Sequence, residues 1–187
     1  MENAHYFLHV TDTHLCFDAE APDICCTEQA LRSLYQTAFA WDHRPAFVLI
    51  TGDLVHEGTS ADYARAKTLL QELDEQYHTK TYPALGNHDN RENFNNAFRE
   101  QASDQPVDYC VQNEWLRWIV LDSSCGQVIG QLSGSQLAWL EQELCDPTDC
   151  PTILALHHPV YGTTTAETDA NNLATGPPDS ALARSSG

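Results

Sequence analysis

Side chains able to bind a metal ion follow four short apolar segments of the sequence. These side chains are Asp12 and His14 after residues 6–10, Asp53 after 46–50, Asn87 and His88 after 80–85, and His157 and His158 at the end of 152–158. Carboxylate, imidazole and amide donors together suit Mn, Fe or Zn better than Ca or Mg, which favour all-oxygen shells. The pattern therefore predicts a transition-metal site, if the four segment ends lie together.

Each motif is weak evidence when taken alone. An Asp-x-His pair is common by chance, Gly-Asp after a strand is usually a turn with an Asx hydrogen bond, and two histidines before a proline usually end a strand. The stretch GNHD at residues 86–89 is the most specific. Its two polar residues have no evident packing purpose, and Gly86 would let the backbone turn sharply beside the ions. Four such motifs in one order favour a metal site over coincidence.

The elements that would position these residues alternate between strands and helices. Strands are expected at 6–10, 46–50, 80–85 (weakened by Pro83) and 152–158, and helices at 27–41, 60–77, 91–101 and 133–144. Apolar stripes are expected at Ala30, Leu34, Ala38 and Trp41 in the first helix and at Tyr63, Ala66, Leu70 and Leu73 in the second, whose N-cap would be Ser60. Residues 107–123 predict two strands joined by a turn at Gln112–Asn113. This order predicts an α/β fold with a mixed sheet, whose ligands bind beyond the carboxyl ends of its strands.

Composition limits the classes of partner. The chain has 187 residues, enough for one domain, and 27 acidic against 9 basic residues give a net charge of −18. That charge argues against non-specific binding to nucleic acid or to an anionic membrane, and no apolar stretch approaches the roughly 20 residues of a membrane span. Seven scattered cysteines and the lack of a signal-peptide pattern at the N-terminus favour a cytoplasmic location. A strongly acidic protein that acts on an anion needs a positive centre, which metal ions supply.

The ordered set DTH, GD, GNHD and HH resembles the calcineurin-like metallophosphoesterases, and most of all the bacterial class III 3′,5′-cyclic nucleotide phosphodiesterases. The resemblance covers residues 5–161. It implies a sandwich of mixed β-sheet flanked by helices, in four layers α/β/β/α. It also implies two metal ions, Fe or Mn with Zn as an alternative. Two ions about 3.5–4 Å apart can clamp a phosphodiester and lower the pKa of a bound water to about 7, so that hydroxide attacks in line.

The resemblance also implies a role for each matched residue. Asp12 and His14 would bind the first metal, Asp53 would bridge both metals, and Asn87 and His157 would bind the second. His158 is the alternative to His157, which is preferred because it comes first after the strand.

His88 matches the catalytic histidine that assists the leaving oxygen, and Asp89 would orient its imidazole. Arg91 would either contact the phosphate or pair with Glu92 or Asp89. The substrate-binding residues implied are His14, Asn87, His88 and Arg91.

The sequence departs from the family pattern at its C-terminal end. The family pattern closes with Gly-His-x-His on a further strand, and residues 159–187 contain no histidine. We therefore expect a phosphoesterase domain at 1–161 that is incomplete at its C-terminus, with one protein ligand fewer for each metal, and a polar, disordered tail at 162–187. Two hypotheses stay open: a metal-dependent phosphodiesterase acting on a small cyclic nucleotide, or a truncated chain with weak or no activity. A phosphomonoesterase or glycerophosphodiesterase is a third, and the oligomeric state, including a dimer, also stays open.

Overall fold

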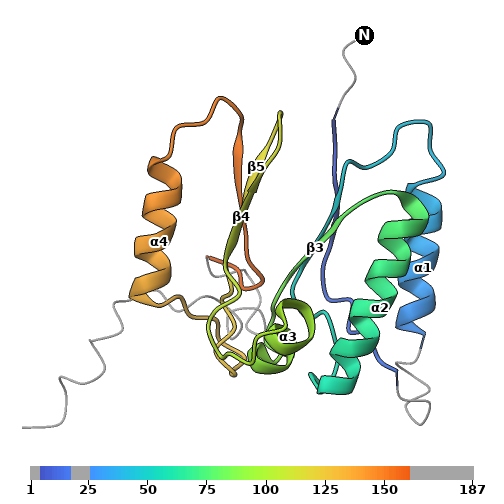
Figure 1. Cartoon of the computed structure of the whole chain (residues 1–187), viewed down its shortest axis with the longest axis horizontal. Coiled ribbons are helices and arrows are strands. Elements are labelled where there is room, and N and C mark those ends of the chain that lie inside the picture. Colours follow the sequence, from blue (N-terminus) through green and yellow to red (C-terminus); the bar gives the residue numbers. More distant parts are fainter. Residues whose placement is uncertain (1–4, 18–25, 161–187) are drawn as a thin grey trace, which may run out of the picture.

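The computed structural model describes residues 5–17 and 26–160 and folds them into two three-stranded sheets (Figure 1). The first sheet is wholly parallel in the order β1-β2-β3, with β1 at Leu8–Val10, β2 at Val48–Thr51 and β3 at Thr81–Ala84. The second has the order β4-β5-β6, with β4 at Tyr109–Gln112, β5 at Arg117–Val120 and β6 at Thr152–Ala155. In it β4 and β5 are antiparallel, whereas β5 and β6 are parallel. The second sheet is thus the expected mixed sheet, and the parallel unit forms a separate sheet of its own.

The helices complete the four-layer α/β/β/α sandwich that the resemblance implies. Helices α1 (Thr27–Ala38) and α2 (Ser60–Tyr77) lie on the outer side of the first sheet, and α4 (Gly134–Cys145) lies on the outer side of the second (Figure 1). Helix α3 (Arg91–Arg99) lies at the lower end of the sandwich in this view. None of the described helices is long and apolar enough to cross a membrane.

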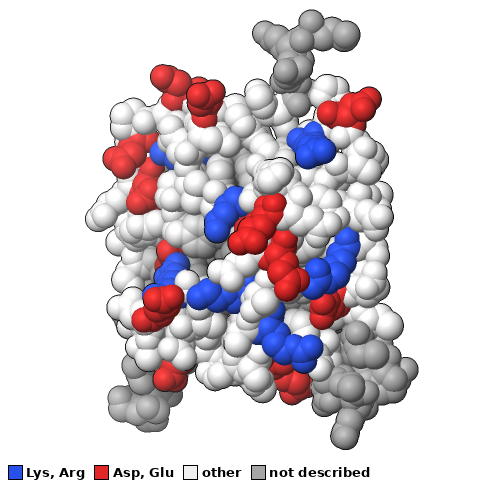
Figure 2. Space-filling view, turned by 45° about the vertical axis from the view of Figure 1, so that its right-hand side comes forward, with Lys and Arg blue, Asp and Glu red and all other residues white. Residues whose placement is uncertain are grey.

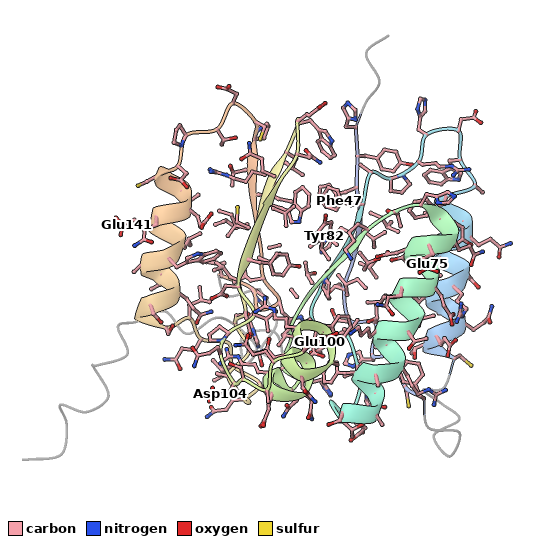
Figure 3. The ribbon with its side chains drawn as sticks, in the orientation of Figure 1. Phe47, Glu75, Tyr82, Glu100, Asp104 and Glu141 are labelled. Carbon is pink, nitrogen blue, oxygen red and sulfur yellow. The ribbon has the colours of Figure 1, made fainter. Side chains whose placement is uncertain are left out.

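Strand β2 and the residue before it supply both layers of the core, because successive side chains of a strand point to opposite faces. Val48 and Ile50 pack with the helices α1 and α2, whereas Phe47 and Leu49 pack between the two sheets. The Phe47 ring stacks on the Trp118 ring with centroids 4.1 Å apart, which joins the first sheet to the second. Phe47 and Tyr82 lie between the two sheets in Figure 3.

Several expected details of the elements differ from the structure. The buried stripe of α1 is Leu31, Tyr35 and Ala38, and Trp41 is 63% exposed because the helix ends before it. The stripe expected at Ala30, Leu34, Ala38 and Trp41 is therefore wrong, except at Ala38. The stripe of α2 is confirmed at Tyr63, Ala66, Leu70 and Leu73.

Three turn and strand details follow from side-chain hydrogen bonding and from strand position. The N-cap of α2 is Thr59 and not Ser60, because Thr59 and Asp62 form a reciprocal capping box. The hairpin turn follows Gln112, with the Asn113 side chain accepting from the backbone of Trp115 and Leu116. Pro83 is tolerated within β3 because this strand is at an edge of its sheet.

The remaining expectations concern cysteines and the C-terminal residues. All six cysteines within 5–17 and 26–160 are free thiols, so the described part contains no disulfide framework. The tail expected at 162–187 lies outside the described residues.

Candidate metal centre

The loops that follow β1 and β2 are hydrogen-bonded to each other. The amide of Asp12 donates to the carbonyl of Gly52 at 3.1 Å, and the amide of His14 donates to the carbonyl of Asp53 at 2.8 Å. Because the two strands are parallel, their carboxyl ends meet at one rim of the sheet, and the hydrogen bonds continue beyond it. Asp12, His14 and Asp53 are therefore brought together, as the sequence predicts.

The backbone at this rim is strained. Five non-glycine residues of the described part have positive φ, and three of them are Asp12 (55°), His14 (40°) and Asp53 (50°). Such conformations cost about 1–3 kcal/mol each and persist where the surrounding structure imposes them, often at functional sites. The strain is thus concentrated on the predicted metal ligands.

The first group of donors has the spacing of ligands on one ion. The Nε2 atom of His14 lies 3.5 Å from Oδ2 of Asp53 and 3.9 Å from Oδ1 of Asp12, which are distances too long for good hydrogen bonds. Two ligands about 2.1 Å from a tetrahedral ion are about 3.4 Å apart. Burial lowers the pKa of His14 below its ordinary value, which favours the neutral imidazole that binds metal ions.

The second group combines Asp53 with Asn87 and His157. The Nε2 atom of His157 lies 3.7 Å from the same Oδ2 atom of Asp53 and 3.2 Å from Oδ1 of Asn87. Nδ1 of His157 donates to the Thr51 carbonyl at 3.0 Å, so Nε2 of the neutral ring carries only a lone pair. That lone pair faces an amide oxygen, an arrangement that a cation between them would stabilise.

Asp53 occupies the centre of both groups. It is 3% exposed, and its Oδ1 atom accepts from the amide of His88 at 2.9 Å. Its Oδ2 atom is left to face His14 and His157. A carboxylate held in this way fits the bridging position expected for Asp53.

Two glycines give the ligands room. A Cβ atom on Gly86 would lie 2.2 Å from Oδ1 of Asp53, and a Cβ on Gly52 would lie 2.5 Å from Nδ1 of His157. Gly52 also has φ +97°, which disfavours any other residue. Gly86 is therefore required for close approach. The expected turn is found there, because the amide of Asp89 donates to the carbonyl of Gly86 at 3.2 Å.

The two neighbouring histidines differ in their hydrogen bonds. His158 is 1% exposed, its Nδ1 atom pairs with the Ser123 hydroxyl at 2.8 Å, and its Nε2 atom pairs with the Val128 carbonyl at 3.1 Å. Both ring nitrogens are thus used within the protein. His157 is the histidine that faces the rim.

Asp89 does not orient the ring of His88, so that expectation is wrong in this structure. The carboxylate is buried and accepts from the backbone amides of Leu54 and Gly86 and from the Tyr63 hydroxyl. Burial raises the pKa of Asp89 to about 6, although these donors act in the opposite direction. Asp89 fastens the loop after β3 to the loop after β2.

The His88 ring is instead positioned by the backbone. Its Nδ1 atom donates to the carbonyl of His56 at 3.1 Å, and its ring lies edge-on to the ring of His14 with centroids 4.7 Å apart. The neutral ring then has Nε2 available at an exposed position. This geometry suits the proton-transfer role that the resemblance assigns to His88.

Arg91 pairs with a residue that was not considered from the sequence. Its Nε atom donates to Oδ2 of Asp122 at 2.7 Å, and its guanidinium also donates to the carbonyl of Ser124. Asp122 is fully buried. The expected partners Glu92 and Asp89 are both wrong, and the guanidinium is committed to the loop after β5 and not to the rim.

One residue near the rim was missed. His56 lies three residues after Asp53, and one nitrogen of its ring, one of His14 and one of His88 lie within 4.8 Å of one another. The signal available in the sequence was a histidine within the same loop as a predicted ligand.

The donor set fits a pair of transition-metal ions. Asp12, His14 and Asp53 form one group, and Asp53, Asn87 and His157 form the other, with about three protein donors each. Mixed oxygen and imidazole donors suit Mn, Fe or Zn.

Comparison with known proteins gives a family and a set of relatives. The family model described as "Calcineurin-like phosphoesterase" matches residues 5–182. A "Probable cyclic nucleotide phosphodiesterase" of Rhodococcus erythropolis is 38% identical over 157 residues, covering 83% of this chain and 52% of that protein. A "cAMP/cGMP dual specificity phosphodiesterase" of Mycobacterium tuberculosis is 34% identical, covering 83% and 50%. A probable glycerophosphodiester phosphodiesterase of Arcobacter nitrofigilis is 33% identical, covering 71% and 49%.

The chain thus spans about half the length of the curated relatives it matches. Among solved structures, a dimetal phosphatase from Danio rerio has a TM-score of 0.62 at 15% identity, covering 86% of this chain and 71% of that one. At that identity the likeness shows the fold alone.

Proposed function

The chain belongs to the calcineurin-like phosphoesterase family, and on that basis we propose that it hydrolyses a small phosphodiester, a 3′,5′-cyclic nucleotide, with the help of two metal ions. The observation that carries the proposal is the convergence of five donors from two sheets on one rim: Asp12, His14, Asp53, Asn87 and His157. Two of the relatives are named as cyclic nucleotide phosphodiesterases, which supports this substrate. Because the chain spans about half of their length, the activity of the whole protein is part of the proposal.

The two donor groups define what the chain would contribute. Asp12 and His14 would hold the first ion, Asn87 and His157 the second, and Asp53 both. Bound ions of the Fe, Mn or Zn type would neutralise the charge of the phosphodiester and activate water. Asp12, His14 and Asp53 have positive φ that the surrounding loops impose, so these donors would be ordered before an ion binds, and the cost of ordering them would be smaller.

His88 would handle the proton of the leaving group. With Nδ1–H donating to the His56 carbonyl, Nε2 is the nitrogen that exchanges a proton with an oxygen of the substrate. Such general acid–base catalysis contributes about 10²–10⁴-fold to a rate. The metal ligands and the proton donor are thus separate side chains.

The charge of the chain favours a small substrate over a polyanion. On the face in Figure 2, the Lys and Arg side chains lie among Asp and Glu side chains. Arg32 pairs with Glu28 and Glu72, and Arg91 pairs with Asp122. A net charge of −18 would repel nucleic acid, whereas a small diester can be held by the ions alone.

Hydrolysis of cyclic AMP and of bis-p-nitrophenyl phosphate with added Mn²⁺ tests the proposal. We expect turnover that EDTA abolishes, and a His88→Ala variant that loses at least about 100-fold in kcat while it still binds Mn²⁺. His43→Ala, which changes an exposed histidine of a loop, is the matched control and should retain activity. If the wild-type chain shows no metal-dependent turnover, the hypothesis of an inactive chain replaces this one.

A glycerophosphodiester is the second candidate substrate, because one relative at 33% identity is named for it. The ratio of kcat/KM for cyclic AMP to that for a glycerophosphodiester decides between them. The proposal predicts a ratio above one.

A further inference from the structure

Three histidines form a group at the side of the rim. His14, His56 and His88 come from the loops after β1, β2 and β3, and one nitrogen from each lies within 4.8 Å of the others. The His14 and His88 ring centroids are 4.7 Å apart, and the His56 ring lies 5.5 Å from each of them. We call these three residues the histidine group. His56 belongs to neither of the two donor groups described above.

Two nitrogens of the histidine group are buried and lack partners. Nδ1 of His14 and Nδ1 of His56 are among only five buried side-chain polar atoms of the described part that form no hydrogen bond. A buried polar atom without a partner costs about 1–3 kcal/mol. A metal ion bound between these rings would give such an atom a partner.

We infer that the histidine group is a further metal site, selective for Zn²⁺ or Cu²⁺ and built from imidazole alone. Three imidazole nitrogens are a common ligand set for Zn²⁺, and Cu²⁺ binds nitrogen donors more tightly than the earlier metals of the row. A tetrahedral ion holds its nitrogens about 3.4 Å apart, so nitrogens up to 4.8 Å apart must approach by up to about 1.4 Å. The ring of His88 is exposed and can supply that movement.

The histidine group shares two members with the proposed catalytic centre. His14 faces Asp12 and Asp53 through Nε2. A neutral imidazole has a single lone pair, so His14 can bind an ion of the histidine group or the first ion of the pair, but not both. An ion on the histidine group would also bind His88, which could then no longer exchange a proton with the substrate. The site is therefore inhibitory, and this last consequence rests on the proposed function, whereas binding itself does not.

Copper binding tests the site without any assay of turnover. Wild-type chain, His56→Gln and the control His43→Gln are each titrated with Cu²⁺ and their electron paramagnetic resonance spectra recorded. Each carboxylate-containing donor group has a single histidine, so among the groups of metal-binding side chains that lie close together in residues 5–17 and 26–160, the histidine group alone offers three imidazole nitrogens to one copper ion. We expect a three-nitrogen splitting in wild type and His43→Gln. In His56→Gln we expect a two-nitrogen pattern with affinity weaker by more than about 10-fold, because even outer-shell losses cost that much.

A further variant separates the two kinds of site. Asp53→Asn weakens the pair centre but leaves the histidine group intact, so the three-nitrogen signal should persist in it. If the signal instead disappears in Asp53→Asn and is unchanged in His56→Gln, copper occupies the pair centre and the inference is overturned. Identical spectra and affinities in wild type and His56→Gln overturn it as well.

A measurement on the unsubstituted chain tests the site without any variant, so misfolding of a variant cannot affect its result. One equivalent of Zn²⁺ should protect His56, but not His43, from modification by diethyl pyrocarbonate, as located by mass spectrometry. Modification of His56 at an unchanged rate contradicts the inference. Absence of Mn²⁺-dependent turnover with protection retained would refute the proposed function alone.

Discussion

A single methyl group at Gly86 should disable the metal centre. In Gly86→Ala, the added Cβ would lie 2.2 Å from Oδ1 of Asp53 and 2.5 Å from its backbone nitrogen. Real Cβ atoms essentially never approach closer than 3.0 Å, so Asp53 or the loop after β3 must move by at least about 0.8 Å. Asp53 faces both histidines through its other oxygen, at 3.5 and 3.7 Å. A movement of that size therefore disturbs the proposed ligands of both ions.

The expected loss follows from two known effects. Overpacking a filled site costs about 1–3 kcal/mol of folding stability. Misplacement by about 1 Å can cost about 100-fold in a site that depends on geometry. We expect Gly86→Ala to bind Mn²⁺ at least about 10-fold more weakly in calorimetric titration and to unfold at lower urea concentration.

Gly134→Ala is the matched control for this substitution. Gly134 is the first residue of α4, and a Cβ there would meet no atom within 4 Å. This variant should keep its Mn²⁺ affinity and gain up to about 0.5–1 kcal/mol of stability. If Gly86→Ala binds Mn²⁺ as tightly as Gly134→Ala does, the close packing of Gly86 on Asp53 is not what shapes the centre.

Three further predictions concern charges and protons away from the ions. Asp89→Asn should lower the free energy of unfolding by about 2–4 kcal/mol, because an amide cannot accept from all the buried donors around it; an unchanged urea midpoint would contradict its anchoring role. Arg91→Met should cost about 3 kcal/mol by leaving the buried Asp122 carboxylate unpaired, whereas a raised KM at unchanged stability would mean that Arg91 contacts the substrate after all. Burial raises the pKa of Tyr35 and of Tyr109, so their stabilising contribution is complete below about pH 10 and declines above it. Urea unfolding at about pH 9 and pH 11 checks this, and a Tyr35→Phe variant with the same pH slope as wild type would refute the part assigned to Tyr35.

The sequence predicted which side chains meet at the rim because each strand and the polar residues after it can be recognised locally. The apolar segments that precede Asp12, Asp53 and Asn87 can each be recognised in the sequence. Because the strands they form are parallel, their carboxyl ends lie together. The position of His157 was less accessible, because it reaches the rim from the second sheet. The pattern of segment ends included His157 and His158 without separating them by role, and the resemblance to a family assigned His157 to the second ion.

Contacts between distant residues could not be predicted in this way. Arg91 and Asp122 are 31 residues apart, and no local pattern distinguishes that partner from the adjacent Glu92. Asp89 follows the proposed catalytic histidine directly, yet its side chain is turned into the protein by donors from two other segments. Adjacency along the chain was therefore a poor guide to which carboxylate pairs with which group.

The sharpest test of the account counts metal ions. The wild-type chain should bind two Mn²⁺ ions, whose electron paramagnetic resonance spectrum shows a magnetically coupled pair, because Asp53 contributes to both donor groups. Asp53→Asn should abolish the coupling and retain one ion at most. Two uncoupled ions in the wild type, or a coupled pair that survives in Asp53→Asn, would show that these side chains do not form one centre.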